Sequence, residues 1–69
     1  MTVEVNVQKL TELRINQGYS KRGLAKAAGL SGPAVYQIER RGSAMPATLK
    51  KLADVLGVKA VDLLEERKA

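Results

Sequence analysis

Residues 20–42 read SKRGLAKAAGLSGPAVYQIERRG, and this stretch decides the fold. It predicts two short helices joined by a tight turn that contains glycine. Five apolar residues fall where two steeply crossing helices would bury them, and seven polar or charged residues fall outside. The inner set is Leu24, Ala28, Leu30, Val35 and Ile38, and the outer set is Lys21, Arg22, Lys26, Tyr36, Gln37, Arg40 and Arg41. Such a hairpin exposes its second helix on the protein surface, where the helix can contact a binding partner.

Helical patterns on both sides of the hairpin extend the prediction to an all-α, compact five-helix bundle. The helices are expected over about 7–17, 20–28, 32–40, 46–56 and 60–66, where apolar residues recur at helical spacing. Ser20 and Ser31 are the expected N-caps of the second and third helices. Gly32 and Pro33 then fall in the first turn of the third helix, where the missing proline N–H is tolerated.

The chain ends are predicted to lie outside this bundle. Residues 1–6 form an N-terminal arm, residues 7–66 the helical domain and residues 67–69 a C-terminal tail. Valines alternate with polar residues over positions 2–7, as in a strand. Because one strand is not stable alone, this segment is either a frayed arm or pairs with another strand, for example its twin in a dimer.

Composition excludes several classes of function. The 69 residues include no cysteine and no histidine, which removes disulfides, thiolate and imidazole metal ligands and the commonest general base. We therefore expect no metal, no cofactor and no catalysis, because caps and phosphate contacts explain the serines and lysines of the hairpin better than a nucleophile does. No apolar run resembles a signal peptide or a membrane span, which favours a cytoplasmic, nucleoid-associated protein.

Positive charge is concentrated in the middle of the chain. The formal net charge is +5, but the segment from Arg14 to Lys51 holds eight positive residues and one negative residue, Glu39, for a local charge of +7. A basic segment that coincides with a helical hairpin indicates a polyanionic partner, and double-stranded DNA is the polyanion that such a hairpin fits.

Three motifs in order along the chain resemble one known family. They are LAKAAGLS at 24–31, VYQIE at 35–39 and PATLKKLADVLGV at 46–58. Together they resemble the small helix-turn-helix domain of phage repressor and Cro-type regulators, the Xre family, over about residues 7–64. The resemblance implies a bundle that places the helix over 32–40 in the DNA major groove, usually as a homodimer on a near-palindromic operator.

The resemblance also implies roles for individual residues. Arg14 and Glu39 match a structural ion pair between the first and third helices. Lys21 stands where the family often has a glutamine that contacts phosphate, and Arg22 and Lys26 are the other phosphate contacts expected from the second helix. Arg40 and Arg41 are expected to reach a phosphate or a base.

Base reading is the weakest part of the match. Relatives often use polar side chains where this chain has Gly32 and Pro33, and neither residue can donate or accept a side-chain hydrogen bond. Discrimination then depends on Gln37, whose amide can pair with adenine, with Ser31 and Tyr36 as lesser contributors and Ala34 against a thymine methyl.

A transcriptional repressor that reads DNA sequence is the function these features favour. Two alternatives stay open at this point. One is an antitoxin that regulates its own operon and binds a toxin through an end of the chain. The other is a protein-interaction module that has kept the fold and lost its base reading. The sequence also does not choose between a repressor, which would block polymerase, and an activator, which would contact polymerase as a protein partner.

Overall fold

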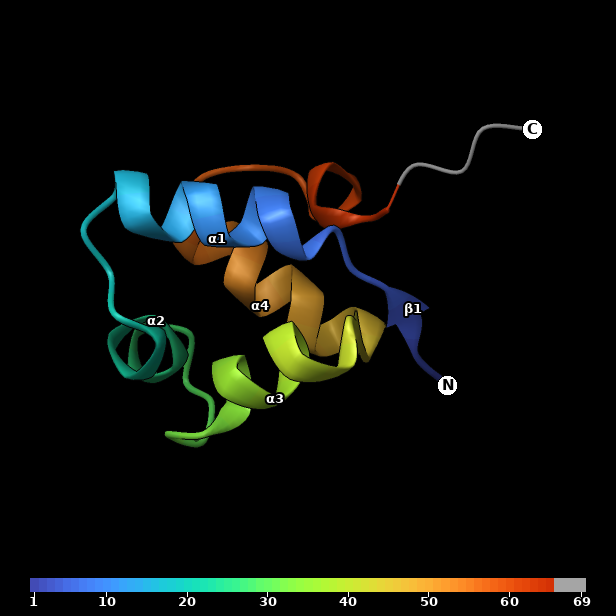
Figure 1. Cartoon of the computed structure of the whole chain (residues 1–69), viewed down its shortest axis with the longest axis horizontal. Helices are drawn as coiled ribbons and strands as arrows, with labels where there is room; N and C mark the ends of the chain where they lie inside the picture. The colour runs from blue at the N-terminus through green and yellow to red at the C-terminus, as the bar shows by residue number, and fades with distance from the viewer. Residues whose placement is uncertain (66–69) are drawn as a thin grey trace.

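The computed structural model describes residues 1–65, which form four α-helices, a two-stranded sheet and one turn of 3₁₀ helix (Figure 1). In chain order these are β1 (Val3–Glu4), α1 (Val7–Asn16), α2 (Lys21–Ala27), α3 (Ala34–Arg41), β2 (Ser43–Ala44), α4 (Pro46–Leu56) and η1 (Ala60–Leu63). The mostly helical fold is therefore confirmed, and the number of five α-helices is wrong.

The predicted fifth helix is only the four-residue 3₁₀ turn η1. It ends because Leu64 adopts an extended backbone, with φ −80° and ψ 147°, and forms an antiparallel bridge with Val5. The backbone carbonyl of Leu63 accepts a hydrogen bond from Asn6 N–H at 2.8 Å. Pairing with the start of the chain thus replaces a further helical turn. The predicted helix end at position 66 and the tail over 67–69 lie outside the described residues.

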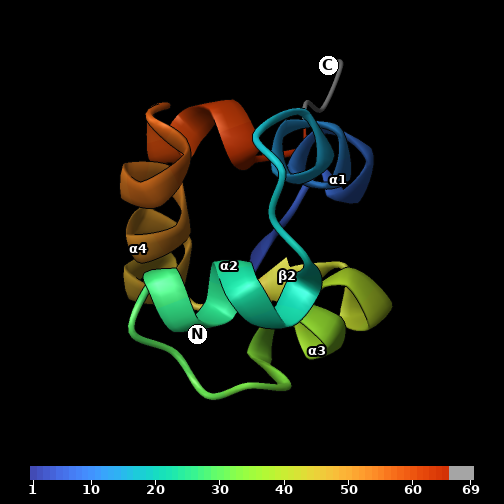
Figure 2. The ribbon, with the colours of Figure 1, turned by 90° about the vertical axis from the view of Figure 1, so that its left-hand side faces the viewer.

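Helix α4 supplies the largest part of the core. Its residues Leu49, Leu52, Ala53 and Leu56 are all buried, as their spacing predicts. In Figure 1, α4 lies between α1 and α3. Figure 2 shows α4 at the left and both α1 and α3 at the right, so α4 lies behind them in the view of Figure 1, and η1 crosses one end of α4. The other fully buried leucines and valines come from every neighbouring element: Val5, Leu10, Leu24, Val35 and Leu63.

The start of the helical hairpin agrees with the sequence. Ser20 caps α2, since its Oγ accepts a hydrogen bond from Gly23 N–H at 2.9 Å. Gly29 has φ +72°, the left-handed conformation that turns the chain sharply after α2. Ala28 and Leu30, expected in the core, are half-buried and pack against its edge.

The predicted start of the third helix is wrong. Helix α3 begins at Ala34, its N-cap is Pro33, and no side chain caps it. Ser31 instead offers its backbone carbonyl, which accepts a hydrogen bond from Ala34 N–H at 3.0 Å. A residue before proline is disfavoured in the helical conformation, so Gly32 cannot open the helix and residues 31–33 form a turn. The helix then continues to Arg41, one residue farther than predicted.

The N-terminal arm is part of the fold. Strand β1 pairs with β2 of the same chain in antiparallel register, with Val3 opposite Ala44 and Glu4 opposite Ser43. The loop predicted before the fourth helix therefore contains a strand, and the arm pairs with this strand of its own chain. Val5, only 1% exposed, anchors the arm in the core.

We expect Val5→Ala to lower the free energy of unfolding by about 1.5–3 kcal/mol, because it removes two buried methyl groups and leaves a cavity. Ile15→Ala removes more of a side chain, but from a position that is 62% exposed, and should change stability by less than about 0.5 kcal/mol. Urea denaturation of the two variants makes the comparison. Equal stability of Val5→Ala and the unaltered chain would show that the arm does not contribute to the core.

Candidate nucleic-acid interface

Helix α3 has one buried face and one exposed face. Val35 and Ile38 are buried and fix the helix to the core, while Gln37, Arg40 and Arg41 are exposed. No residue of the first turn carries an acidic side chain. The exposed face thus offers one amide and two guanidinium groups, which are the side chains best suited to hydrogen bonds with base edges and phosphates.

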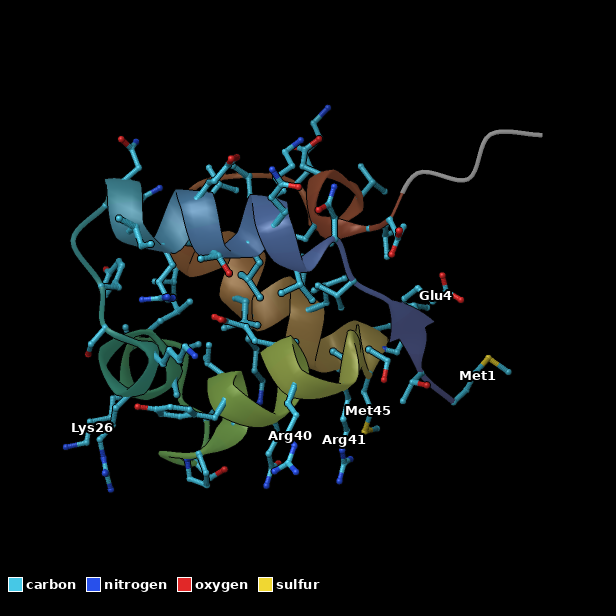
Figure 3. The ribbon with its side chains drawn as sticks, viewed as in Figure 1. Met1, Glu4, Lys26, Arg40, Arg41 and Met45 are labelled. Carbon is cyan, nitrogen blue, oxygen red and sulfur yellow. The ribbon has the colours of Figure 1, made fainter. Side chains whose placement is uncertain are left out.

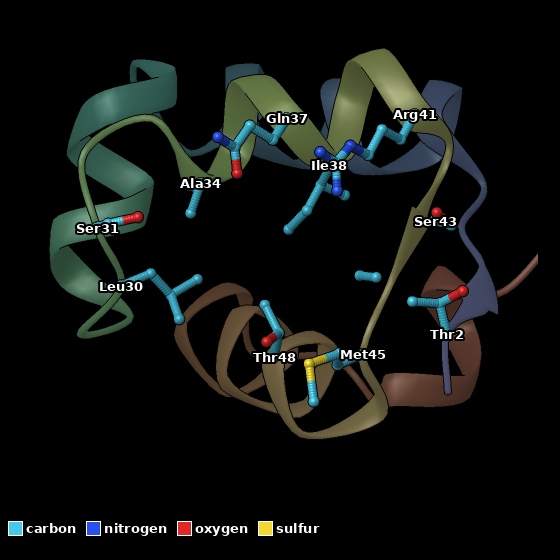
Figure 4. A pocket seen from close by; sticks show the side chains of 11 residues that line it. Thr2, Leu30, Ser31, Ala34, Gln37, Ile38, Arg41, Ser43, Met45 and Thr48 are labelled. Carbon is cyan, nitrogen blue, oxygen red and sulfur yellow. The ribbon is translucent and has the colours of Figure 1, made fainter.

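Gln37 lies on the crest of α3 between two hollows. The first lies between α3 and the start of α4 (Figure 4), and we call it the α3–α4 hollow. Its lining is Thr2, Leu30, Ser31, Ala34, Gln37, Ile38, Arg41, Ser43, Ala44, Met45 and Thr48. The second, the α2–α3 hollow, is lined by Val7, Lys21, Tyr36, Gln37, Glu39 and Arg40. Gln37 lines both, whereas Arg41 and Arg40 each line one, so a guanidinium stands on each flank of the amide.

Three of the expected phosphate contacts point to the same side of the molecule. Lys26, in the last turn of α2, points to the same side as Arg40 and Arg41 of α3 (Figure 3). All three side chains are exposed. This side of the molecule is therefore strongly basic, and it is the side on which α3 is exposed.

Arg22 covers the turn that precedes α3. A Cβ atom built at Gly32 would lie 3.2 Å from Arg22 Nη2, so the guanidinium lies against this glycine. Ser31 and Pro33, on either side, are exposed, and Ala34 is half-buried. Glycine at position 32 thus makes room for the arginine, and the turn presents a backbone surface with a cation beside it.

The carboxylate of Glu39 joins α1, α2 and α3. Arg14 Nε donates to Glu39 Oε2 at 3.3 Å, and the two side chains are only 11% and 10% exposed. Thr11 Oγ1 donates to Glu39 Oε1 at 3.3 Å, while Arg14 Nη1 donates to the carbonyl of Tyr19 at 2.9 Å. The structure therefore brings the expected pair together and adds two partners that the sequence analysis missed. Thr11 stands three residues before Arg14 on α1, and this spacing was the available signal.

Lys21 lies farther inside the protein than an ordinary phosphate contact. Its Nζ is 3.6 Å from Glu39 Oε1 and 4.8 Å from the centroid of the Tyr36 ring. Tyr36 and Glu39 are three residues apart on α3, so one ammonium reaches both. This arrangement was not predicted from the sequence, in which Lys21 and Tyr36 were each expected to contact DNA.

Within residues 1–65 no group of three or more acidic, histidine or cysteine side chains is placed to hold a metal ion. In the same part of the chain no helix has the length and apolar character needed to cross a bilayer.

Removal of the Glu39 carboxylate should destabilise the fold. Glu39→Ala leaves the nearly buried Arg14 without its counterion, and we expect a loss of about 3 kcal/mol or more. Asp54→Ala is the matched control, since it removes the carboxylate of the exposed Lys50–Asp54 pair and should cost less than about 0.5 kcal/mol. Thermal and urea denaturation followed by circular dichroism measure both, and similar melting temperatures for the two variants would contradict a structural role for Glu39.

The helix-turn-helix family model matches residues 10–63, which is most of the chain and includes all four α-helices apart from the first turn of α1. Neither the curated proteins nor the solved structures gave a match. The family match agrees with the hairpin of α2 and α3, with the exposed amide and guanidinium groups of α3 and with the basic side of the molecule. The chain belongs to the helix-turn-helix family of the phage repressor and Cro type, a family of DNA-binding transcription regulators.

Proposed function

We propose that this protein is a repressor that binds a near-palindromic operator as a homodimer and reads its sequence with α3. The observation that carries the proposal is the position of Gln37, exposed on the crest of α3 with Arg40 and Arg41 on its two flanks. A helix fits the major groove of B-DNA, and an amide on its crest meets base edges there. The flanking guanidinium groups then face the two sugar-phosphate strands.

Base reading in this proposal is carried by few side chains. Gln37 pairs with an adenine through its amide, and Ala34 packs against a thymine methyl group. Tyr36 and Ser31 add lesser contacts at the two sides of the helix. Gly32 and Pro33 contribute through the shape of the turn, which brings the backbone close to the DNA.

Affinity in this proposal comes mainly from phosphate contacts. Lys26 supplies one from α2, and Arg22 supplies another beside the turn at Gly32. Arg40 and Arg41 supply contacts from the end of α3. These contacts hold α3 in the groove and make binding strongly dependent on salt concentration. Repression needs nothing more than this occupancy, since a protein bound over a promoter excludes polymerase.

A homodimer is supported by an apolar surface away from Arg40 and Lys26. A shallow hollow between β1, α4 and η1 is lined by Val3, Pro46, Leu49, Ala60, Val61 and Leu64, without a charged residue. Val61, one of these lining residues, is 65% exposed. A second copy that covers this surface buries apolar area and meets no charged residue within the hollow itself. Two α3 helices are then presented to half-sites about one helical turn, roughly 34 Å, apart.

We expect Val61→Lys to weaken this dimer, because it places a charge in an apolar contact. Analytical ultracentrifugation across a concentration series should give a dissociation constant at least about tenfold higher for the variant, a change of about 1.4 kcal/mol. Ile15→Lys is the control, since Ile15 is similarly exposed on α1, outside the hollow. A monomeric unaltered chain at all concentrations, on and off DNA, would contradict the dimer.

Selection from a random duplex library tests the proposed function directly. An enriched near-palindrome bound at least about a thousandfold tighter than a scrambled duplex is the expected result. A reporter gene that carries the enriched sequence in its promoter then tests repression. If no sequence is enriched and binding to every duplex depends steeply on salt, the protein does not read DNA sequence. That outcome would favour a protein-interaction module or an antitoxin, and co-purification would identify the protein partner.

The variants Gln37→Ala and Lys26→Ala separate base reading from phosphate contact. Gln37→Ala should cost about 1–3 kcal/mol on the enriched sequence and relax the preference at one base pair. Lys26→Ala should weaken binding to all duplexes alike and reduce the slope of the salt dependence by about one. Fluorescence anisotropy over a salt series measures both, and an equal loss on all duplexes for Gln37→Ala would show that Gln37 does not read a base.

A further inference from the structure

Lys21 makes two contacts within the protein that an ordinary phosphate-binding lysine does not need. Its ammonium lies 3.6 Å from Glu39 Oε1 and 4.8 Å from the centre of the Tyr36 ring. It is the first residue of α2, directly after the N-cap Ser20, so its backbone is held in place. Only about a third of its side chain is exposed, at 34%. The ammonium is therefore directed along the side of α3.

Tyr36 is the side chain that this arrangement orders. Tyr36 is 55% exposed, precedes Gln37 on α3 and lines the α2–α3 hollow. A tyrosine at such a position has more than one rotamer open to it on a helix. The attraction between the ammonium and the face of the ring favours the one rotamer in which the ring lies under Lys21.

Glu39 fixes the position of Lys21 in turn. Its carboxylate is held by Arg14 and Thr11 from α1, so Oε1 is a fixed acceptor rather than a mobile surface carboxylate. A chain of contacts thus leads from α1 to Glu39, from Glu39 to Lys21 and from Lys21 to Tyr36. From Glu39 to Lys21 to Tyr36, each step joins a less exposed group to a more exposed one.

We propose that Lys21 is a positioning residue for sequence preference, which holds the Tyr36 ring in the orientation that α3 presents to DNA. This inference rests on the proposed function and changes the role of one residue in it. An ordered ring meets the apolar part of a base pair, such as a thymine methyl, at one position. A ring free to rotate meets several sequences about equally well.

A double-mutant cycle of Lys21→Met and Tyr36→Leu tests the inference on the enriched duplex and on a scrambled one. Lys21→Met should lower the ratio of the two affinities roughly three- to tenfold, which is the range expected for loss of a cation–π contact. In the Tyr36→Leu background the same change should leave that ratio unaltered. Lys21→Arg, which keeps a cation over the ring, should restore most of the ratio. Lys26→Met is the control, because it should weaken both affinities and leave their ratio unchanged.

Nuclear magnetic resonance gives a second readout that does not involve DNA. The ε-methylene protons of Lys21 should be shifted upfield by the ring of Tyr36 and return to ordinary values in Tyr36→Leu. Ordinary values in the unaltered chain would overturn the inference.

The binding data distinguish failure of this inference from failure of the proposed function. If the unaltered chain discriminates between duplexes but Lys21→Met weakens both equally, Lys21 is a phosphate contact and only the inference fails. If the unaltered chain does not discriminate, the proposed function fails and the inference fails with it.

Discussion

The carboxylate of Glu39 is the constraint on which the interface depends. It accepts hydrogen bonds from Arg14 and Thr11 of α1 and lies 3.6 Å from the ammonium of Lys21 at the start of α2. Glu39 itself is part of α3, so one side chain fixes the relative positions of three helices. Apolar packing alone permits small rotations of α3 about its axis, whereas directional bonds to a nearly buried charge do not. The direction in which Gln37 and Arg41 point follows from this one group.

The cluster around Glu39 satisfies its polar groups even though water is nearly excluded. Arg14 is paired with Glu39 and also donates to the carbonyl of Tyr19, so its guanidinium has protein partners on two sides. In the described part of the chain no buried side-chain nitrogen or oxygen lacks a hydrogen-bond partner. A cluster of this kind contributes less to net stability than to the choice of one arrangement over others, because its partly bonded alternatives are costly.

Local signals in the sequence were sufficient for most of the helical fold. Ser20 and the helical spacing of Leu49, Leu52 and Leu56 identify elements from a few neighbouring residues, and the structure confirms them. The prediction that Ser31 caps the third helix was wrong because Pro33 disfavours the helical conformation of Gly32. This restriction outweighs the preference for a serine hydroxyl at a helix N-cap. The short β1–β2 sheet and the end of η1 depend on contacts between distant segments, for which no local pattern exists.

The site was less predictable than the fold for the same reason. The exposure of Gln37, Arg40 and Arg41 follows from their place on one helix face, and the pairing of Arg14 with Glu39 came from the resemblance to a family. The contacts of Lys21 with Tyr36 and Glu39 join two helices across a turn, and only the packed structure brings them together.

The pairing of the N-terminal arm has a consequence for the order in which the molecule assembles. Val5 N–H donates to the carbonyl of Gly42 and Asn6 N–H to that of Leu63, so a segment synthesised before the helices binds segments synthesised after most of them. Helices α1 to α4 are joined by short connections and can associate as they emerge, whereas the arm has to wait. The arm can therefore complete its pairing only after both the loop that follows α3 and the turn of η1 have been synthesised.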